Sequence, residues 1–521
     1  MVDIYDFKTE AQKVLAKLEK EKELNEKPVG DDEGLPSDCI YRNRKEAEEG
    51  LRELKELNEK HAFVHNYGGK PAVKMEVWNE VYNKKIVEFM VVDSIITIYN
   101  NRVAEETRGT KGVQTLGRWW LYHPHRKDYI TVTFEPDRAP GEYHVEDKYK
   151  KKRAEEDKKN GQGDNQDIHV TYFNSWEGLG VIPKKGSWKK MRKHIYVVLC
   201  NKNKIKFKYV IKWLAWAVQN PGLPAQVALI FKGKKGAGKG LVLQSMVDIF
   251  GRHGLVISNR EHLTGKHNQH LATCAFLYAD EAYYPGDKEV EGILKNLITE
   301  KTLTTEPKFR ELRTSRNCLH IAMATNADWV IPATEDERRY FINEVDNKYA
   351  KGECSDFIRE QYFDSIWKEK KDGGLEAMLY DLLKINLTNG WVPRNSVPET
   401  EELRRQIAMS LPKLKYAFMR LLEDGIFPGS IDGEGKYVIS NTNLLSHIQN
   451  MEPGNKTITG KALTKLCKVD LKLETSRTAA FRYYIFPELG ELRKTWHERV
   501  TKNTEWRTNE KWELSEGNKS F

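Results

Sequence analysis

The sequence has 521 residues, of which 39% are hydrophobic and 31% are charged. At about 150 residues per domain, this length predicts three or four domains, and the composition excludes a small single module or a disordered chain. The longest apolar runs, such as residues 227–231, are far shorter than the roughly 20 residues of a membrane-spanning helix. The charged first residues are not typical of a secretion signal, so we expect a cytoplasmic protein with no membrane association.

The net charge of +9 is unevenly distributed along the chain. Residues 178–247 contain fifteen Lys or Arg and no Asp or Glu, whereas the rest of the chain holds 70 basic and 76 acidic residues. A local positive field of this kind suits a polyanion such as DNA or a nucleotide phosphate. A basic face that is merely solvated is the alternative.

The six cysteines are scattered along the chain without a close pair, at positions Cys39, Cys200, Cys274, Cys318, Cys354 and Cys467. This spacing argues against a zinc ribbon or a disulfide framework. It is typical of a reducing cytoplasm in which most thiols are simply buried.

The first half of the chain predicts an arm and a small domain. Leu51, Leu54 and Leu57 stand at helical spacing, which predicts a helical arm over residues 1–60. Residues 61–145 form strand-like runs, including a hairpin that turns at Gly68 and Gly69, and predict a small mixed α+β domain. Residues 146–167 have almost no apolar side chains and are interpreted as a charged linker or an insertion.

The second half predicts an α/β domain followed by further modules. Four strand-like runs, QVALIF, AFLYAD, LHIAMAT and RYFINEV, alternate with helical patterns, which indicates a mostly parallel sheet. Trp213 and its neighbours are interpreted as core packing rather than as a base-stacking surface. The predicted parts are a basic helical lead-in over 168–225, a P-loop NTPase core over 226–346, a helical region over 347–430 and a winged-helix-like domain over 431–521.

The segment after the first of these strands has the pattern of a phosphate-binding loop. It reads GKKGAGKG over residues 233–240 and precedes a helical pattern, so strand, glycine loop and helix occur in the required order. Glycines let backbone N–H groups turn toward a phosphate at a helix N-terminus, and Lys239 would reach the β and γ phosphates. The predicted ATP-binding residues are Gly233, Lys234, Lys235, Gly236, Ala237, Gly238, Lys239, Gly240 and Leu241.

This loop departs from the usual pattern at its end. Such loops normally finish with Ser or Thr, whose hydroxyl ligates magnesium, and here the position is Gly240. Either a water takes the place of that hydroxyl at the magnesium ion, or the loop binds nucleotide weakly.

Acidic and amide side chains follow two later strands. The apolar strand CAFLYADEA ends in Asp280 and Glu281, 41 residues or more after Lys239, and we assign Asp280 as the Mg²⁺ ligand. Glu281 would orient or deprotonate the attacking water, and Asn326, after LHIAMAT, would hold that water or the γ-phosphate. A DE pair at an ordinary strand end is the alternative.

Two arginines precede the last strand of the set. Phosphoryl transfer is catalysed mostly by charge stabilisation at the γ-phosphate, so an arginine presented by a neighbouring subunit is an expected component. Arg338 is the preferred candidate for this arginine, which is called an arginine finger. Arg339 is the second candidate, and it would otherwise form a structural ion pair with Glu335 or Asp336.

Read together, these motifs resemble a superfamily 3 helicase of the AAA+ class. Five segments, FNSWEGLGVIPKKGSW, IKWLAWAVQNPG, FKGKKGAGKG, LYADEAYYPGDK and MATNADWVIPATEDERRYF, are similar to phage and prophage replication helicases related to the poxvirus-type primase-helicases. The likeness covers roughly residues 61–400. Glycine after the loop lysine is familiar in that subgroup.

The resemblance implies a homo-oligomeric ring, usually a hexamer, with ATP between subunits and single-stranded or forked DNA at a central pore. It also implies a pore hairpin between the acidic strand and the Asn-ended strand. In that interval Lys308, Phe309 and Arg310 would lie near the tip, with Arg313 and Arg316 on the returning strand. Cations there would hold phosphates and Phe309 would stack on a base or sugar, the alternative being an idle basic hairpin.

Three functions remain open at this point. The main hypothesis is an ATP-dependent DNA helicase for phage or mobile-element replication, located in the host cytoplasm if phage-encoded. Because residues 1–140 lack a convincing paired-carboxylate polymerase motif, priming would need a separate primase or polymerase, and the N-terminal region would build a collar. The alternatives are a nucleotide-switched replication initiator or DNA-loading scaffold without unwinding activity, and a P-loop enzyme acting on small molecules.

The tail contains a second group of basic residues. Lys461, Lys465 and Lys468 share one face of a predicted helix, and with Arg477 and Arg482 beyond it they would touch duplex or origin DNA. The alternative is that this helix is a lid that packs on the ring.

Overall fold

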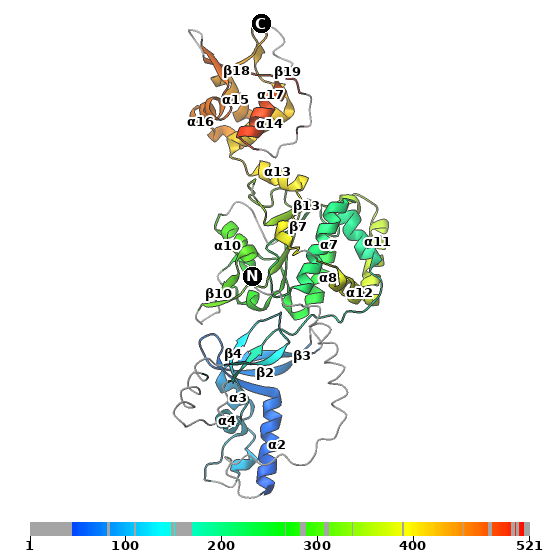
Figure 1. Ribbon diagram of the computed structural model, residues 1–521, viewed down its shortest axis with the longest axis vertical. Coiled ribbons are helices and arrows are strands. Elements are labelled where there is room, and N and C mark those ends of the chain that lie inside the picture. The colour runs from blue at the N-terminus through cyan, green and yellow to red at the C-terminus, as the bar shows by residue number, and fades with distance from the viewer. Residues whose placement is uncertain are drawn as a thin grey trace. The chain divides into compact units, whose positions relative to one another are not determined.

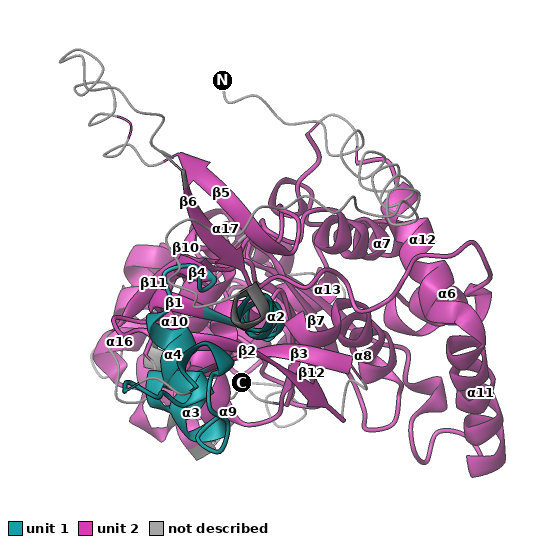
Figure 2. Ribbon diagram, turned by 90° about the horizontal axis from the view of Figure 1, so that it is seen from below, with its two compact units in different colours: residues 1–62, 90–127 teal, residues 63–89, 128–521 magenta. Residues whose placement is uncertain are grey.

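The structure is a computed structural model of the whole chain. It describes residues 44–80, 84–108, 111–146, 151, 169–265, 267–281, 288–306, 312–335, 337–387, 390–451, 453–477, 482–501, 506 and 510–514. The chain divides into two compact units, one of residues 1–62 and 90–127 and one of residues 63–89 and 128–521, coloured teal and magenta in Figure 2.

The first unit is helical. Its elements are α2 (Arg44–Lys60), α3 (Val92–Ile98), the 3₁₀ turn η1 (Glu105–Thr107) and α4 (Leu116–Tyr122). Leu54 and Leu57 of α2 are buried, as their spacing predicts, and Trp120 of α4 is fully buried. The indole Nε1 of Trp120 donates to Asn58 Oδ1 at 2.9 Å, which ties α4 to α2. The part of the predicted arm before Arg44 lies outside the described residues.

A six-stranded sheet with the order β3-β2-β1-β4-β6-β5 follows the helical arm in sequence. Its strands are β1 (His61–Asn66), β2 (Ala72–Asn79), β3 (Lys84–Met90), β4 (Asp128–Thr133), β5 (Gly141–Glu146) and β6 (His169–Asn174). The hairpin predicted at Gly68 and Gly69 is confirmed as the turn between β1 and β2, where both glycines have positive φ.

The predicted end of the small domain at residue 145 is too early. Strand β6 pairs with β5 in antiparallel register and with β4 in parallel register, so it completes the six-stranded sheet instead of starting the lead-in. Residues 146–167 therefore connect two paired strands and are an insertion, not a linker between domains. Most of this insertion lies outside the part of the chain that the structure describes.

The second unit also contains a five-stranded sheet that is parallel throughout (Figure 1). Its order is β13-β7-β12-β9-β8, with β7 (Ala228–Lys232), β8 (Gly254–Ile257), β9 (Phe276–Asp280), β12 (His320–Thr325) and β13 (Tyr340–Glu344). The four strand-like runs of the sequence are thus confirmed, and β8 is an edge strand that they did not include. All five strands end at the same edge of the sheet because they are parallel.

Both faces of this sheet are covered by helices. Alternate residues of one strand face opposite sides: Leu229 and Phe231 pack with α7 and α8, whereas Ala228 and Ile230 pack with α10 and α13. Figure 1 shows α7, α8 and α12 on one side and α10 on the other. The covering and neighbouring helices are α6 (Lys189–His194), α7 (Lys204–Gln219), α8 (Lys239–Phe250), α9 (Arg260–Thr264), α10 (Lys288–Thr299), α11 (Asp356–Glu369), α12 (Leu375–Lys384) and α13 (Glu401–Met409). Trp213 of α7 is fully buried, so its predicted role in the core is confirmed.

The last part of the chain has its own apolar core. It contains α14 (Lys413–Asp424), α15 (Asn441–Met451), α16 (Gly460–Lys465) and α17 (Leu489–Arg499), with the short strands β14 (Ile426–Phe427) and β19 (Glu513–Leu514) paired in parallel. Its four-stranded sheet has the order β15-β16-β18-β17, formed by β15 (Ser430–Ile431), β16 (Tyr437–Ser440), β17 (Glu474–Arg477) and β18 (Arg482–Phe486). The mixture of short strands and helices is that predicted from the sequence.

Two expectations from composition have a structural counterpart. Among the described residues, no helix is both long enough and apolar enough to cross a membrane. Five cysteines are described and free, and four of them are buried, namely Cys200, Cys274, Cys318 and Cys467. The prediction that most thiols are buried is confirmed for this part of the chain.

Candidate active site

The glycine loop lies at the carboxyl edge of the parallel sheet, between β7 and α8. Gly238 is the N-cap of α8 and has φ +88°, a left-handed conformation that favours glycine. A Cβ atom at Gly238 would lie 2.6 Å from His194 Cε1 and 2.6 Å from Phe363 Cε1, so the neighbours also exclude a side chain. All nine predicted ATP-binding residues belong to this loop and the first turn of α8.

Lys239 is folded back over the loop. Its Nζ donates hydrogen bonds to the carbonyl oxygens of Gly233 at 2.5 Å and Lys234 at 2.9 Å. A third hydrogen bond goes to Asn326 Oδ1 at 2.6 Å. Burial lowers the pKa of Lys239, and the nearby charges of Glu281 and Asp280 oppose that effect.

Asn326 joins the loop lysine to the acidic strand end. Strand β12 lies between β7 and β9 in the sheet, so its final residues separate the glycine loop from Asp280 and Glu281. Asn326 Nδ2 donates to Glu281 Oε1, while its Oδ1 accepts from Lys239. The structure therefore brings Lys239, Asn326 and Glu281 together in one hydrogen-bonded chain.

Glu281 has an unusual backbone. Its φ is +54°, in the left-handed region that residues other than glycine rarely adopt, and its N–H donates to the carbonyl of Ala324 at 3.0 Å. Such a conformation costs free energy and persists only where the surroundings enforce it. Here it directs the carboxylate toward Asn326 immediately after the last residue of β9.

Asp280, the last residue of β9, is the predicted magnesium ligand. Two residues earlier, Tyr278 is buried, and burial followed by the charge of Asp280 and a hydrogen bond with it raises the pKa of the Tyr278 hydroxyl. The carboxylates of Asp280 and Glu281 supply the oxygen donors that Mg²⁺ prefers. The donor set of this strand end therefore fits magnesium.

His194 supports the loop and was not identified from the sequence. Its Nε2 lies 3.0 Å from the carbonyl oxygen of Gly238 and its Nδ1 lies 3.0 Å from the Tyr362 hydroxyl. Burial lowers the pKa of His194 to about 4, so the ring is neutral and one nitrogen can donate to Gly238 while the other accepts from Tyr362. A lone histidine in a lysine-rich segment has no local signature for this role.

Side chains from after β13 hold the other end of the loop. Asn347 Oδ1 accepts from the backbone N–H of Lys234 at 2.8 Å, and Lys234 Nζ pairs with Glu353. On α11, Arg359 Nη1 lies 3.6 Å from where a Cβ of Gly236 would stand. These contacts come from the segment 347–359, which the motif pattern did not single out.

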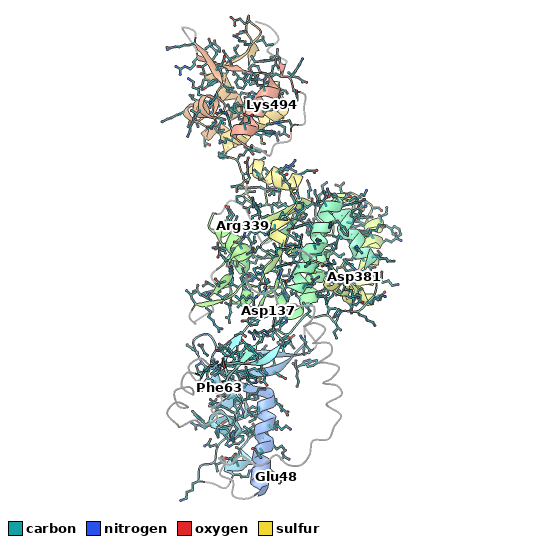
Figure 3. The ribbon with its side chains drawn as sticks, in the orientation of Figure 1. Glu48, Phe63, Asp137, Arg339, Asp381 and Lys494 are labelled. Carbon is teal, nitrogen blue, oxygen red and sulfur yellow. The ribbon has the colours of Figure 1, made fainter. Side chains whose placement is uncertain are left out.

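The two predicted finger arginines differ in their surroundings. Arg339, labelled in Figure 3, contacts Glu337 through Nη1 at 3.3 Å, so it pairs with a carboxylate two residues away that the sequence pattern did not indicate. Of the two predicted partners, Asp336 lies outside the described residues. Arg338 is exposed and has no hydrogen bond or ion pair with any residue that the structure describes. Both arginines precede β13 and therefore lie at the sheet edge opposite to the glycine loop.

Two antiparallel strands lie in the interval in which the hairpin was predicted. Strands β10 (Thr302–Thr305) and β11 (Arg313–Arg316) pair in antiparallel register, and the tip residues Lys308, Phe309 and Arg310 lie outside the described residues. Arg316 on the returning strand pairs with Asp137 at 2.8 Å and Glu135 at 3.3 Å (Asp137 is labelled in Figure 3). Arg313 lies over the ring of Tyr67 at 5.3 Å from its centroid, so both described arginines have partners within the chain.

Comparison with known proteins adds to this picture of the fold. A family of unknown function (DUF5906) matches residues 231–339, which include the glycine loop, the acidic strand end, Asn326 and both arginines. A search of curated proteins found no match.

Three solved structures of the C-terminal region of NrS-1, all described as apo, resemble the chain with TM-scores of 0.53, 0.53 and 0.51. Their identities are 18%, 18% and 17%, and each alignment covers 84% of this chain and 99% or more of the other. At this identity the likeness concerns the fold, a mixed α/β architecture around a mostly parallel sheet.

Proposed function

We propose that this protein is an ATP-dependent DNA helicase that acts as a homo-oligomeric ring in phage or mobile-element DNA replication. The observation that carries the proposal is the hydrogen-bonded chain from Lys239 through Asn326 to Glu281. It connects a phosphate-binding lysine to a carboxylate suited to act on water. The resemblance of the motifs to superfamily 3 helicases of the AAA+ class supports the DNA-replication context.

The loop supplies the binding energy for the triphosphate. Its backbone N–H groups at the N-terminus of α8 would hold the β-phosphate, and the partial positive charge of that terminus favours the anion. Lys239 would exchange its hydrogen bonds to Gly233, Lys234 and Asn326 for phosphate oxygens. Bound Mg²⁺, held by Asp280, would neutralise charge on the β and γ phosphates.

The exchange at Lys239 has a consequence for the water-activating groups. Once the lysine binds phosphate, Asn326 Oδ1 becomes available to hold the attacking water while its Nδ2 still contacts Glu281. Glu281 then accepts the proton of that water or orients it for in-line attack. Nucleotide binding and assembly of the hydrolytic groups are thereby coupled through one amide.

The position of Arg338 favours a ring. Strands β13 and β7 are parallel, and Tyr340 at the start of β13 pairs with Ala228 at the start of β7. Arg338 therefore lies before the first residue of β7, whereas Gly233 directly follows the last residue of β7. Seven residue steps at about 3.3 Å each separate the two levels by about 23 Å. An arginine side chain cannot span this distance, so Arg338 would act on the γ-phosphate of a neighbouring subunit.

The contacts to DNA are proposed for the hairpin tip and the basic segments. Because Arg313 and Arg316 have partners within the chain, Lys308, Phe309 and Arg310 are the stronger candidates for the strand in the pore. The basic stretch from Lys184 to Lys212 would lie near the DNA entrance. A winged-helix role of the C-terminal part, with Lys461 and Lys465 exposed on α16, is proposed on the same grounds.

The decisive experiment compares ATP turnover of the wild type and Lys239→Ala, each with and without single-stranded DNA. We expect DNA-stimulated hydrolysis that the substitution abolishes; equal rates in the two proteins would remove the assignment of the loop. A forked-duplex assay then separates the helicase from the alternative. Nucleotide-dependent assembly without strand displacement, unaffected by Glu281→Gln, would identify a nucleotide-switched initiator or loading scaffold.

A further inference from the structure

Position 240 is where a phosphate-binding loop normally carries its hydroxyl, and here it is a glycine. A Cβ atom at Gly240 would lie 2.6 Å from the hydroxyl oxygen of Tyr278 and 3.5 Å from Cζ of the same ring. The first distance is shorter than van der Waals contact allows. The hydroxyl of Tyr278 therefore excludes a side chain from position 240, and it stands close to where a serine or threonine hydroxyl would be.

The orientation of Tyr278 is determined by its surroundings. The side chain is 5% exposed and its ring belongs to the core between the sheet and α8. Residues two apart on a strand point to the same face, so Tyr278 and Asp280 share the face of β9 that meets α8. The phenol of Tyr278 on β9 therefore packs against the first turn of α8, two residues before the predicted magnesium ligand Asp280.

We propose that Tyr278 is a positioning residue that replaces the missing loop hydroxyl and, together with Asp280, holds the magnesium ion of the bound nucleotide. This inference rests on the proposed function, because it concerns the metal of the same ATP site. Gly240 and Tyr278 then complement each other. Tyr278 of β9 supplies the hydroxyl oxygen that the loop lacks, and glycine at position 240 leaves room for that hydroxyl.

The chemistry of the phenol suits this role. Mg²⁺ requires oxygen ligands in near-octahedral geometry and usually keeps several waters. A protonated tyrosine hydroxyl has one donor and an acceptor oxygen, so it can donate to the Asp280 carboxylate and accept from a metal-bound water. The Tyr278 hydroxyl would therefore increase the affinity for nucleotide in the presence of Mg²⁺ and leave the affinity without the metal unchanged.

The test measures the affinity for ADP carrying a fluorescent ribose label, once with Mg²⁺ and once with EDTA. For Tyr278→Phe we expect the gain in affinity due to Mg²⁺ to fall about tenfold, the effect of one hydrogen bond to a charged group, with unchanged affinity in EDTA. In the double variant Gly240→Ser with Tyr278→Phe the nearest remaining ring atom is 3.5 Å from the new Cβ, an ordinary contact. This variant should recover the gain.

The matched control is Gly240→Ala with Tyr278→Phe, which adds the same Cβ without a hydroxyl and should stay as weak as Tyr278→Phe. Recovery by the alanine variant as well as by the serine variant, or a full magnesium gain in Tyr278→Phe, would overturn the inference. Failure of the wild type to bind the labelled ADP under either condition would instead overturn the proposed ATP site. The two failures are therefore distinguishable.

Discussion

Removing the guanidinium of Arg338 should abolish hydrolysis without weakening nucleotide binding. By strand register, the backbone level of Arg338 is about 23 Å from that of its own glycine loop, a distance that an arginine side chain cannot span to the nucleotide of its own subunit. Arginine fingers contribute about 10³-fold or more to kcat because they stabilise charge that develops in the transition state. For Arg338→Ala we expect a loss of this size in kcat and an unchanged Kd for ATP.

A mixing experiment tests the placement between subunits. In a ring each interface joins the loop of one subunit to the arginine of the next. An equimolar mixture of Lys239→Ala and Arg338→Ala leaves about one interface in four with both groups intact, so it should recover about a quarter of the wild-type ATPase rate. Either variant alone should be inactive.

The control is Arg339→Ala. Arg339 contacts Glu337 of its own chain, so Arg339→Ala should affect stability more than ATP turnover. A mixture of Arg339→Ala with Lys239→Ala should show no more ATPase activity than the Arg339→Ala protein has alone. Zero ATPase in the Lys239→Ala and Arg338→Ala mixture at every ratio, under conditions where the two proteins co-assemble, would refute a finger acting between subunits.

Three further predictions concern DNA binding, stability and pH. Replacing Lys308 and Arg310 by Ala together should weaken single-stranded DNA binding and reduce the slope of log affinity against log salt concentration by about 1.4, as measured by fluorescence anisotropy over a salt series. Glu402→Ala should destabilise the region around β7 by about 2 kcal/mol, measured by hydrogen exchange of its amides, because buried Lys232 would lose its buried partner at 3.1 Å and keep only the exposed carboxylate of Asp328 at 3.3 Å. The pKa of buried His194 is lowered to about 4, so the unfolded chain binds more protons than the folded one between about pH 6.5 and pH 4. Stability should therefore be lost as the pH falls through this window, by about 1.4 kcal/mol per pH unit, and His194→Gln should lose less between pH 7.5 and 5 in the same exchange measurement.

Each of these predictions has a control and a contradicting result. An Ala pair at the exposed lysines Lys368 and Lys371 removes the same charge outside the hairpin, and an equal loss of DNA affinity there would contradict a specific role of the tip. Glu399→Gln removes the carboxylate charge of an exposed pair with Arg404 and should change stability by less than about 1 kcal/mol. If it costs as much as Glu402→Ala, burial is not the cause. An identical acid sensitivity of the wild type and His194→Gln would contradict the pH argument.

Local patterns predicted much of the fold and of the site. The strands QVALIF, AFLYAD, LHIAMAT and RYFINEV are apolar runs whose composition demands burial on both faces, so their existence and parallel direction follow from the sequence itself. The glycine loop is equally local, because a helix N-terminus and positive φ at glycine are properties of a few adjacent residues. Carboxyl ends of parallel strands share one edge, so the predicted proximity of Asp280, Glu281 and Asn326 to Lys239 needs no further information.

Long-range pairing decided the rest, because contacts between distant segments leave no periodic trace in either of them. The order of the sheet, with β12 between β7 and β9, makes Asn326 the link from Lys239 to Glu281. Only the folded chain reveals that Tyr278 fills the space beside Gly240, a relation between residues on a strand and a helix. In the same way, β6 lies between β4 and β5 in the six-stranded sheet, beyond the predicted boundary, since the hydrogen-bond partners of a strand are selected by the whole sheet and not by the strand's own composition.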